Sequence, residues 1–325
     1  MESKKNKLKV AWIHNFNRNP YISSGIWMFK LYDSIKNKES EIKIDLIDIG
    51  NINNPFLLVK NIFKYKRIFK EYDILHAQYG SGTGFLTSLF PNQKLLSLRG
   101  SDWHYFKSPN LAERFHSWLS CLLSKISLKK YKTIIVMSER MKNEINSEFV
   151  EMDVRVVPDG IDLNTFYPTE SNKNKLTFRV LFSSVDSNNR IKRYNLAEKA
   201  FNIFHEKYPE SELVFMHGIS YEKVNEFINS ANVILLTSMH EGWPNIIKEG
   251  LACNVPFVST DVNDLHNIVQ QTNSCIICKD DPESLAAGIE SVYLSDNEIN
   301  IRHFANQFEI QKVTAKLIEI YREHL

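Results

Sequence analysis

Two acidic side chains in the second half of the chain, Glu241 and Glu249, have the spacing to bind an extended polar ligand. Pro244 suits the first turn of a helix and Asn254 suits its end, so we expect a short helix over residues 244–253. Glu249 would then lie about 7.5 Å along the helix from Pro244. Carboxylates so far apart cannot act on one atom. They can bind two sets of hydroxyl groups, such as the hexose and the ribose of a nucleotide sugar.

The amino end of this expected helix is itself a candidate binding site. It follows an apolar run at residues 233–236 that we expect to be a strand, which places it at the carboxyl edge of a sheet. The first N–H groups of a helix have no partner within the helix and carry the positive end of its dipole, which suits a phosphate or sugar hydroxyls. The alternative is that Glu241 is an ordinary loop acid and Glu249 an ordinary surface residue.

Strands and helices are expected to alternate around this segment. Short β-branched runs predict strands, and longer stretches of helical period predict helices. In the first half we expect strands at 8–14, 42–49, 74–77, 95–98, 133–137 and 154–157, with helices at 25–35, 57–69 and 111–128. In the second half we expect strands at 178–183, 213–217, 233–236, 256–260 and 274–278, with helices at 194–208, 221–230, 244–253, 282–294 and about 308–324. This alternation predicts parallel sheets covered on both faces.

A turn-rich segment from Pro158 to Pro168 interrupts the alternation and predicts a hinge. We therefore expect an α/β fold of two Rossmann-like, doubly wound lobes, residues 1–165 and 166–305. A C-terminal helix at about 306–325 is expected to pack back on the first lobe. Because ligands of such sheets bind at the carboxyl ends of the strands, a cleft is expected between the lobes.

Composition excludes several classes of protein. Lys and Arg number 40 against 38 Asp and Glu, a net charge of +2 with an isoelectric point of about 8.2, which does not point to nucleic acid. Four cysteines are too few for a disulfide framework, and Cys275 and Cys278 fit a strand better than a zinc site. With no apolar run of ~18 residues and no signal peptide, we expect a cytoplasmic protein.

The charge is unevenly divided between the two halves. Residues 1–165 carry 25 basic and 17 acidic side chains, whereas residues 166–325 carry 15 and 21. Two basic amphipathic segments, 60–70 and 111–131, account for much of the excess. Such segments can lie on an anionic membrane surface, which would make the protein peripheral at the inner membrane face. They can equally be ordinary helices whose apolar face covers a sheet and whose other face is exposed to solvent.

Five motifs carry a resemblance to a known family. They are Asp73-Ile-Leu-His-Ala-Gln-Tyr-Gly80, Leu98-Arg-Gly-Ser-Asp-Trp103, Val136-Met-Ser-Glu-Arg-Met141, Val156-Val-Pro-Asp-Gly-Ile-Asp-Leu-Asn-Thr-Phe166 and Glu241-Gly-Trp-Pro-Asn-Ile-Ile-Lys-Glu-Gly250. In this order, and over nearly the whole chain, they resemble the family 4 glycosyltransferases. Members of that family have the two-lobed GT-B fold, use nucleotide sugars and retain the anomeric configuration.

The resemblance implies roles for the residues around the short helix. Glu241 would contact the donor hexose near the reacting carbon, and Glu249 would bind the ribose. The backbone of four consecutive residues would hold the sugar or the distal phosphate: Gly242, Trp243, Pro244 and Asn245.

The family also places a basic pair after the first strand of the second lobe, where it holds the diphosphate. Lys192 matches the lysine, while Arg190 and Arg193 both remain candidates for the arginine. Preorganised cations at this place stabilise the negative charge of the departing nucleotide. His217 and Gly218, after another strand of the same lobe, would line the nucleobase pocket.

In the first lobe, Arg99 occupies the position where many relatives carry His. It would neutralise a phosphate or carboxylate and could not serve as a base, because the pKa of arginine exceeds about 12. Asp102 and His104 would lie within hydrogen-bonding range of the same site. Gly25, after Ser23-Ser24, would let the backbone approach donor or acceptor, or would simply form a turn.

These expectations predict a glycosyltransferase that moves a hexose from a nucleotide diphosphate sugar to a hydroxyl acceptor with retention. The first lobe would bind the acceptor, a glycolipid or polysaccharide intermediate, and the second lobe would bind the nucleotide-sugar donor. Neither a metal nor another cofactor is expected. Two alternatives remain open. One is a different GT-B-type enzyme, a sugar-nucleotide epimerase or a glycan phosphorylase. The other is a non-catalytic module that binds sugar nucleotides.

Overall fold

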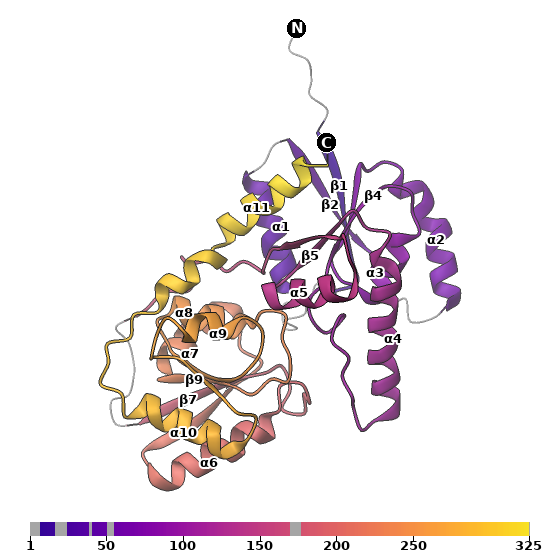
Figure 1. The fold of residues 1–325 in the computed structure, drawn as a ribbon. Coiled ribbons are helices and arrows are strands. Elements are labelled where there is room, and N and C mark those ends of the chain that lie inside the picture. Colours follow the sequence, from indigo (N-terminus) through magenta and orange to yellow (C-terminus); the bar gives the residue numbers. More distant parts are fainter. Residues whose placement is uncertain (1–6, 17–24, 39–40, 51–54, 170–176, 325) are drawn as a thin grey trace. The chain divides into compact units, whose positions relative to one another are not determined.

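The computed structural model describes residues 7–16, 25–38, 41–50, 55–169 and 177–324 (Figure 1). The chain divides into two compact units. The first comprises the described residues up to Asp159 together with those from Gln311 onward, and the second comprises Gly160–Ile310. Each unit contains one parallel sheet flanked by helices, which confirms the predicted α/β class with two parallel sheets.

The first unit is built on six parallel strands in the order β2-β1-β3-β4-β5-β6. The strands are β1 (Leu8–His14), β2 (Ile42–Asp48), β3 (Ile74–Ala77), β4 (Gln93–Ser97), β5 (Thr133–Val136) and β6 (Asp153–Val156). The helices are α1 (Ile26–Lys38), α2 (Pro55–Phe69), α3 (Ser81–Ser88), α4 (Leu111–Leu128), α5 (Glu139–Glu148) and α11 (Ile310–Arg322). β3 and β5 are buried at every position, as expected of strands covered on both faces. The strand order reverses between β1 and β3, where such sheets usually bind ligands.

The second unit contains five parallel strands in the order β11-β10-β9-β7-β8. The strands are β7 (Phe178–Ser183), β8 (Ser211–Met216), β9 (Val233–Leu236), β10 (Phe257–Thr260) and β11 (Ile276–Cys278). The helices are α6 (Tyr194–Lys207), α7 (Tyr221–Ser230), α8 (Asn245–Ala252), α9 (Leu265–Val269), α10 (Pro282–Tyr293) and a 3-10 helix (Arg302–Phe308). Here the strand order reverses between β7 and β9, so their carboxyl ends border the expected ligand position.

The structure differs from the expected helices in two bounds and in three additional helices. α8 begins at Asn245 with Pro244 as its N-cap, so the proline precedes the first turn instead of occupying it. The last helix begins at Ile310, because residues 302–308 form a 3-10 helix. The helices α3, α5 and α9 were not predicted by the apolar pattern. α3 has the sequence SGTGFLTS, whose glycines and serines have low intrinsic helix propensity.

Close packing against α4 explains why α3 forms despite its composition. A Cβ on Gly80, the N-cap of α3, would collide with Ser124 Oγ of α4, and a Cβ on Gly84 would lie 3.1 Å from Leu96 Cδ1. Ser124 Oγ also accepts a 2.6 Å hydrogen bond from the N–H of Ser81. Small residues are therefore required where the two helices meet, and tertiary contacts outweigh propensity.

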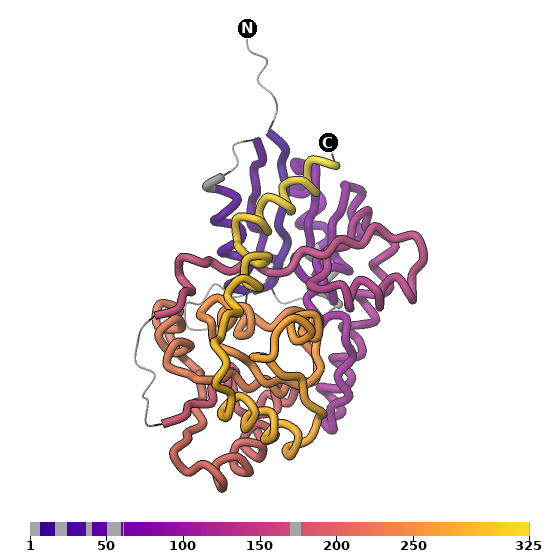
Figure 2. The backbone as a smooth tube through the Cα atoms, turned by 60° about the vertical axis from the view of Figure 1, so that its left-hand side comes forward, coloured from indigo at the N-terminus to yellow at the C-terminus, as the bar shows by residue number. Residues whose placement is uncertain are grey.

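A buried hydrogen-bond chain fastens α11 to the first sheet. Trp12 Nε1 donates to the Tyr321 hydroxyl at 2.6 Å, and that hydroxyl lies 2.6 Å from His76 Nδ1. The indole can only donate, so the Tyr321 hydrogen goes to His76 Nδ1. His76 then carries its own proton on Nε2, 2.8 Å from Ser97 Oγ. Figure 2 shows α11, in yellow, against the indigo first strands that this chain of bonds reaches.

We expect Tyr321→Phe to lower the free energy of unfolding of the first unit by about 2 kcal/mol. The substitution leaves Trp12 Nε1 and His76 Nδ1 buried without a partner, at about 1–3 kcal/mol for an unsatisfied group. Urea unfolding followed by tryptophan fluorescence measures it, because four of the five tryptophans lie in this unit. Tyr293→Phe, at a 39% exposed ring, is the matched control and should change little. Equal stability of the two variants would contradict the assignment.

The stability of the first unit should also depend on pH through His76. Complete burial and the nearby charge of Arg99 hold the pKa of His76 well below 6.5. The unfolded chain therefore binds a proton that the folded chain excludes, so this stabilising contribution is present above about pH 6.5 and is lost as the pH falls. Between about pH 6.5 and 5 the slope should approach 1.4 kcal/mol per pH unit. His76→Gln should flatten that slope, and the exposed-site control His303→Gln should leave it.

Candidate functional site

Two loops at the carboxyl edge of the second sheet are bound tightly to each other. One follows β7 and contains residues 184–193; the other follows β9 and contains residues 237–244. Thr237 Oγ1 lies 2.7 Å from the carbonyl oxygen of Lys192 and 3.1 Å from that of Arg193, in position to donate to either. The N–H of Met239 donates to the carbonyl of Ile191 at 2.9 Å. These bonds fix the backbone of both loops before any ligand is present.

Lys192 and Glu241, which the sequence placed in separate motifs, form an ion pair across these loops. Lys192 Nζ lies 2.5 Å from Glu241 Oε1, and Ser238 Oγ donates to the same oxygen at 2.6 Å. The side chains of Lys192 and Glu241 are 25% and 15% exposed. Asn263 Nδ2 donates to the Glu241 carbonyl at 3.3 Å and holds the loop from its other side. The ammonium group of Lys192 and the carboxylate of Glu241 are thus held together in the loop that precedes α8.

The structure separates the two candidate arginines. Arg193 Nε donates to the Thr237 carbonyl at 2.6 Å, its Nη1 donates to Asp280 at 2.7 Å, and its Nη2 donates to the Ser238 carbonyl at 3.3 Å. Its backbone has the left-handed φ of 56° at the N-cap of α6. Arg193 therefore supports the two loops, whereas Arg190 is exposed in the turn before Lys192.

The amino end of α8 offers backbone donors to a ligand. No side chain caps it, and the N–H groups of Ile247 and Lys248 bond back to the Pro244 carbonyl at 3.2 and 3.3 Å. Within the described chain the N–H groups of Asn245 and Ile246 have no partner. They are the first orphan donors of the helix and carry its positive end.

Trp243 and Gly242, also expected to hold the donor, lie on either side of this turn. The Trp243 ring packs on Phe308 with centroids 4.4 Å apart, and hence belongs to the apolar core of the unit. Gly242 is buried. The Trp243 indole therefore anchors the loop in the core, and only the backbone of Gly242 and Trp243 is in a position to contact a ligand.

The remaining donor-side residues lie near the same sheet edge. Glu249 is half-buried on α8, and its charge adds to burial in raising the pKa of Tyr221 and, to about 12, that of Cys253. His217 and Gly218 follow β8 and are both exposed, with the His217 ring 4.7 Å from that of Phe215. Gly218 has a φ of 62° and open space around its Cα.

In the first unit, Arg99 is held by a set of bonds at the carboxyl end of β4. Its Nη1 pairs with Asp159, its Nη2 donates to Gln78 Oε1 at 3.3 Å, and its guanidinium lies 3.6 Å from the centre of the Trp27 ring. Burial lowers the pKa of Arg99, and Asp159 and Asp102 oppose that shift. The guanidinium stays charged but is already partnered.

Asp102 lies within hydrogen-bonding range of Arg99, but through the Arg99 backbone. It is fully buried, and its two carboxylate oxygens accept hydrogen bonds from the N–H groups of Gly80, Arg99 and Gly100 at 2.7, 2.8 and 3.0 Å. Both carboxylate oxygens of Asp102 therefore join the loop after β4 to the start of α3. Asp102 therefore supports Arg99 instead of facing a ligand.

His104 and Gly25 also have structural partners. His104 Nε2 lies 2.8 Å from Glu144 Oε2 of α5, and together with Trp103 it holds the pKa of Glu144 below its usual value despite burial. Gly25 starts α1 with a φ of 79°, and a Cβ there would collide with Phe16. The turn therefore requires glycine. Ser23 and Ser24 lie outside the described residues.

Several residues that shape the site were not predicted. Thr237 holds the backbone of Lys192, Ser238 and Asn263 hold Glu241, and Gln78 and Trp27 hold Arg99. Their contacts are those described above. The sequence held one signal for three of these residues, which is their position. Thr237 and Ser238 directly follow the buried strand β9, and Gln78 directly follows the buried strand β3, so each lies at the carboxyl edge of its own sheet.

Across the described ranges, no three His, Cys, Asp or Glu side chains are placed to hold a metal ion. None of the described helices is long and apolar enough to cross a membrane.

Comparisons with known proteins agree with this geometry. The family model described as "Glycosyl transferases group 1" matches residues 195–295. An uncharacterized glycosyltransferase of Methanocaldococcus jannaschii is 22% identical over 299 residues, which cover 85% of this chain and 81% of that protein.

Solved structures are similar over nearly the whole chain. Sucrose-phosphate synthase from Thermosynechococcus elongatus has a TM-score of 0.75 at 17% identity, covering 98% of this chain and 99% of that one. Anabaena HepE, solved in complex with UDP and glucose, has a TM-score of 0.71 at 13% identity, covering 97% and 100%. Residues 195–295 of this chain thus match the group 1 glycosyltransferase model, and the chain as a whole is similar to a glycosyltransferase in sequence and has the GT-B fold.

Proposed function

We propose that the protein moves a hexose from a nucleotide diphosphate sugar to a hydroxyl acceptor, with retention of anomeric configuration. The observation that carries the proposal is the Lys192–Glu241 ion pair beside the uncapped amino end of α8. A diphosphate needs a cation and backbone donors, and a hexose needs a carboxylate for its hydroxyls. All three stand within one pair of bonded loops.

Without ligand, Lys192 and Glu241 neutralise each other. When a donor binds, the diphosphate takes over Lys192 together with the N–H groups of Asn245 and Ile246, and Glu241 turns to the hexose hydroxyls. As the glycosyl–phosphate bond breaks, negative charge grows on the departing phosphate, and preorganised donors stabilise it without reorganisation. Arg190, exposed in the same loop, is the arginine we assign to the diphosphate.

The rest of the donor follows from the positions of the other residues. Glu249 binds the ribose, and His217 with Gly218 borders the nucleobase. The departing phosphate oxygen accepts the proton of the acceptor hydroxyl on the face that it leaves, so the configuration is retained. That the solved Anabaena protein holds UDP and glucose supports a nucleoside diphosphate sugar as donor.

Lys192→Ala should slow the release of nucleoside diphosphate from the nucleotide sugar by about 10²–10³-fold, because a group that stabilises charge in the transition state is lost. Glu241→Gln keeps the size but loses the charge, and should weaken hexose recognition more than binding of free nucleoside diphosphate. A thermal-shift panel of nucleotide sugars first identifies the donor, since a ligand at 100 times its Kd stabilises by about 2.7 kcal/mol.

Lys199→Ala, at an exposed lysine of α6, is the matched control and should keep full activity. Retained turnover in Lys192→Ala would contradict the proposal. Nucleotide-sugar binding without any turnover, in the wild type and with all acceptors, would favour the non-catalytic module. Conversion of the sugar nucleotide into a stereoisomer would favour the epimerase.

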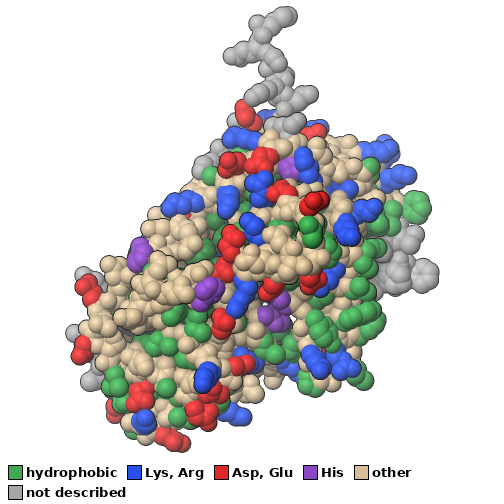
Figure 3. Space-filling view, in the orientation of Figure 1, with side chains coloured by type: hydrophobic (Ala, Val, Ile, Leu, Met, Phe, Trp, Pro, Cys, Tyr) green, Lys and Arg blue, Asp and Glu red, His purple; other side chains and the backbone are tan. Residues whose placement is uncertain are grey.

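We also propose that the first unit contacts an anionic membrane surface. On α2 the Phe63 ring is 74% exposed between the exposed lysines Lys60 and Lys64. On α4 three further apolar side chains are exposed, and Figure 3 shows hydrophobic side chains gathered along this helix; they are Leu111, Phe115 and Trp118. Apolar side chains within a basic helix face are typical of interfacial attachment.

The protein should therefore co-sediment with vesicles that contain anionic lipid and not with neutral ones, and binding should weaken at high salt. Phe63→Ser should reduce sedimentation, whereas Val185→Ser, at a 67% exposed site of the second unit, should not. Equal sedimentation with both vesicle types, or with neither, would exclude the membrane contact.

A further inference from the structure

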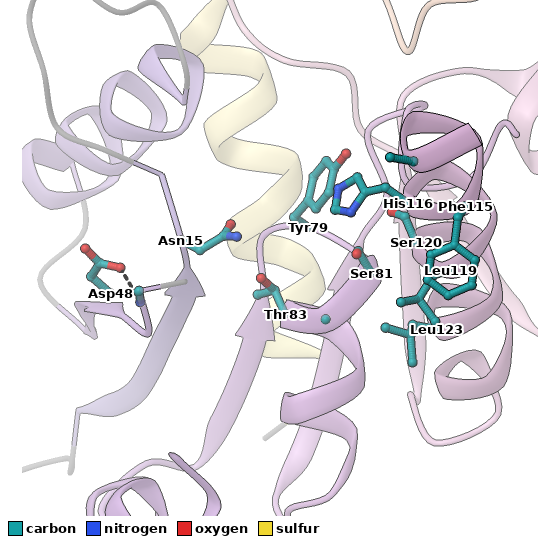
Figure 4. Close-up of a pocket in the computed structure, with 13 residues that line it drawn as sticks. Asn15, Asp48, Tyr79, Ser81, Thr83, Phe115, His116, Leu119, Ser120 and Leu123 are labelled. Carbon is teal, nitrogen blue, oxygen red and sulfur yellow. Dashed lines mark hydrogen bonds between the residues drawn. The ribbon is translucent and has the colours of Figure 1, made fainter. Parts of the chain in front are cut away.

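A cavity lies in the first unit, at the carboxyl edge of its sheet (Figure 4). Its volume is about 820 Å³. It opens beside the point where the strand order reverses between β1 and β3, and one long side is formed by α4. None of the residues assigned above to the donor lines it.

The floor of the cavity contains a polar group with no partner. Thr83 of α3 is 1% exposed, and its hydroxyl has no hydrogen-bond partner. A buried hydroxyl without a bond costs free energy, so such groups are rare and point to a missing ligand or water. In Figure 4 the Thr83 side chain lies at the base of the cavity between Asn15 and Ser81.

The amino end of α3 adds backbone donors at the same place. Gly80 caps the helix without a side-chain bond, and the N–H of Ser81 is taken by Ser124. Within the described chain, the N–H groups of Gly82 and Thr83 have no partner. Both residues line the cavity.

The two sides of the cavity differ in chemistry. Asn15 and Asp48 stand at the ends of β1 and β2 on the polar side, as Figure 4 shows. Opposite them, Phe115, Leu119 and Leu123 of α4 are four residues apart in turn, and therefore form one apolar stripe along the helix. No Lys or Arg is among the described residues that line the space.

We propose that this cavity binds the acceptor, and that the acceptor is a neutral glycoside with an apolar aglycone. The inference rests on the proposed function. The sugar ring lies at the amino end of α3, where Thr83, Asn15 and Asp48 bond its hydroxyls. The aglycone lies along Phe115, Leu119 and Leu123. A phosphorylated acceptor fits worse, because its charge would meet the Asp48 carboxylate, and the described lining residues offer the His116 imidazole but no lysine or arginine to compensate.

Octyl β-glucoside below its micelle concentration is the probe, compared by calorimetry with hexyl β-glucoside, glucose and octyl phosphate. Each methylene buried on α4 should tighten binding by up to about fourfold, which is 0.8 kcal/mol at RT of 0.59. Octyl glucoside should therefore bind more tightly than hexyl glucoside, and glucose should bind most weakly. Tighter binding of octyl phosphate than of octyl glucoside would overturn the proposal in favour of an anionic acceptor.

Two threonines of α3 make a matched pair of variants. Thr83→Val removes a hydroxyl that has no internal partner, so it should weaken octyl glucoside binding about five- to tenfold and leave the unfolding midpoint unchanged. Thr87→Val removes a hydroxyl that donates to the Thr83 carbonyl at 2.8 Å, so it should lower the midpoint and leave binding unchanged. Leu119→Ser should abolish the dependence on chain length. Unaltered binding in Thr83→Val would refute the site.

Binding of nucleotide sugar to the same samples separates the two proposals. If the wild type binds a nucleotide sugar but no glycoside, only the acceptor assignment fails. If no nucleotide sugar binds, the proposed function itself fails.

Discussion

The candidate site of the second unit depends on one constraint, the bonding of two loops through Thr237. Its hydroxyl reaches the carbonyls of Lys192 and Arg193, while the Arg193 side chain returns to the Thr237 carbonyl. These contacts fix the backbone of Lys192, and thereby the point from which its side chain reaches Glu241. Catalysis by fixed charges needs such preorganisation, because a flexible lysine would lose in conformational entropy what it gains in electrostatic attraction.

Buried hydrogen bonds also join separate elements in the first unit. The buried carboxylate of Asp102 joins the loop after β4 to the start of α3. The Tyr321 hydroxyl joins α11 to β1 and β3. In both cases a buried polar group is stable because it is fully bonded, and removing one partner would leave another unsatisfied. Thr83 stands out against this background, since its hydroxyl is buried and unbonded on the floor of a cavity.

Much of the fold could be predicted from local pattern. β1, β3, β7, β9, α4 and α7 have the boundaries expected from periodicity and turn residues. α3 could not be predicted in this way, because only its contact with α4 makes a glycine-rich helix favourable. The candidate site divides similarly. Glu241 and Lys192 were singled out from motifs, whereas the contacts of Arg193 were not predicted. Those contacts depend on where its guanidinium lies relative to Thr237 and Asp280.

The sequence by itself determined the alternation of strands and helices, the family and the residue types at the donor site. These are properties of spacing and side-chain chemistry, which short segments carry with them. Only the tertiary structure decided which polar groups are already bonded. It showed that Asp102 and Arg193 bond the loops around them, that Glu241 is paired with Lys192, and that the buried hydroxyl of Thr83 has no hydrogen-bond partner. Hydrogen bonding between residues far apart in the chain depends on distances of a few tenths of an ångström, which no linear pattern contains.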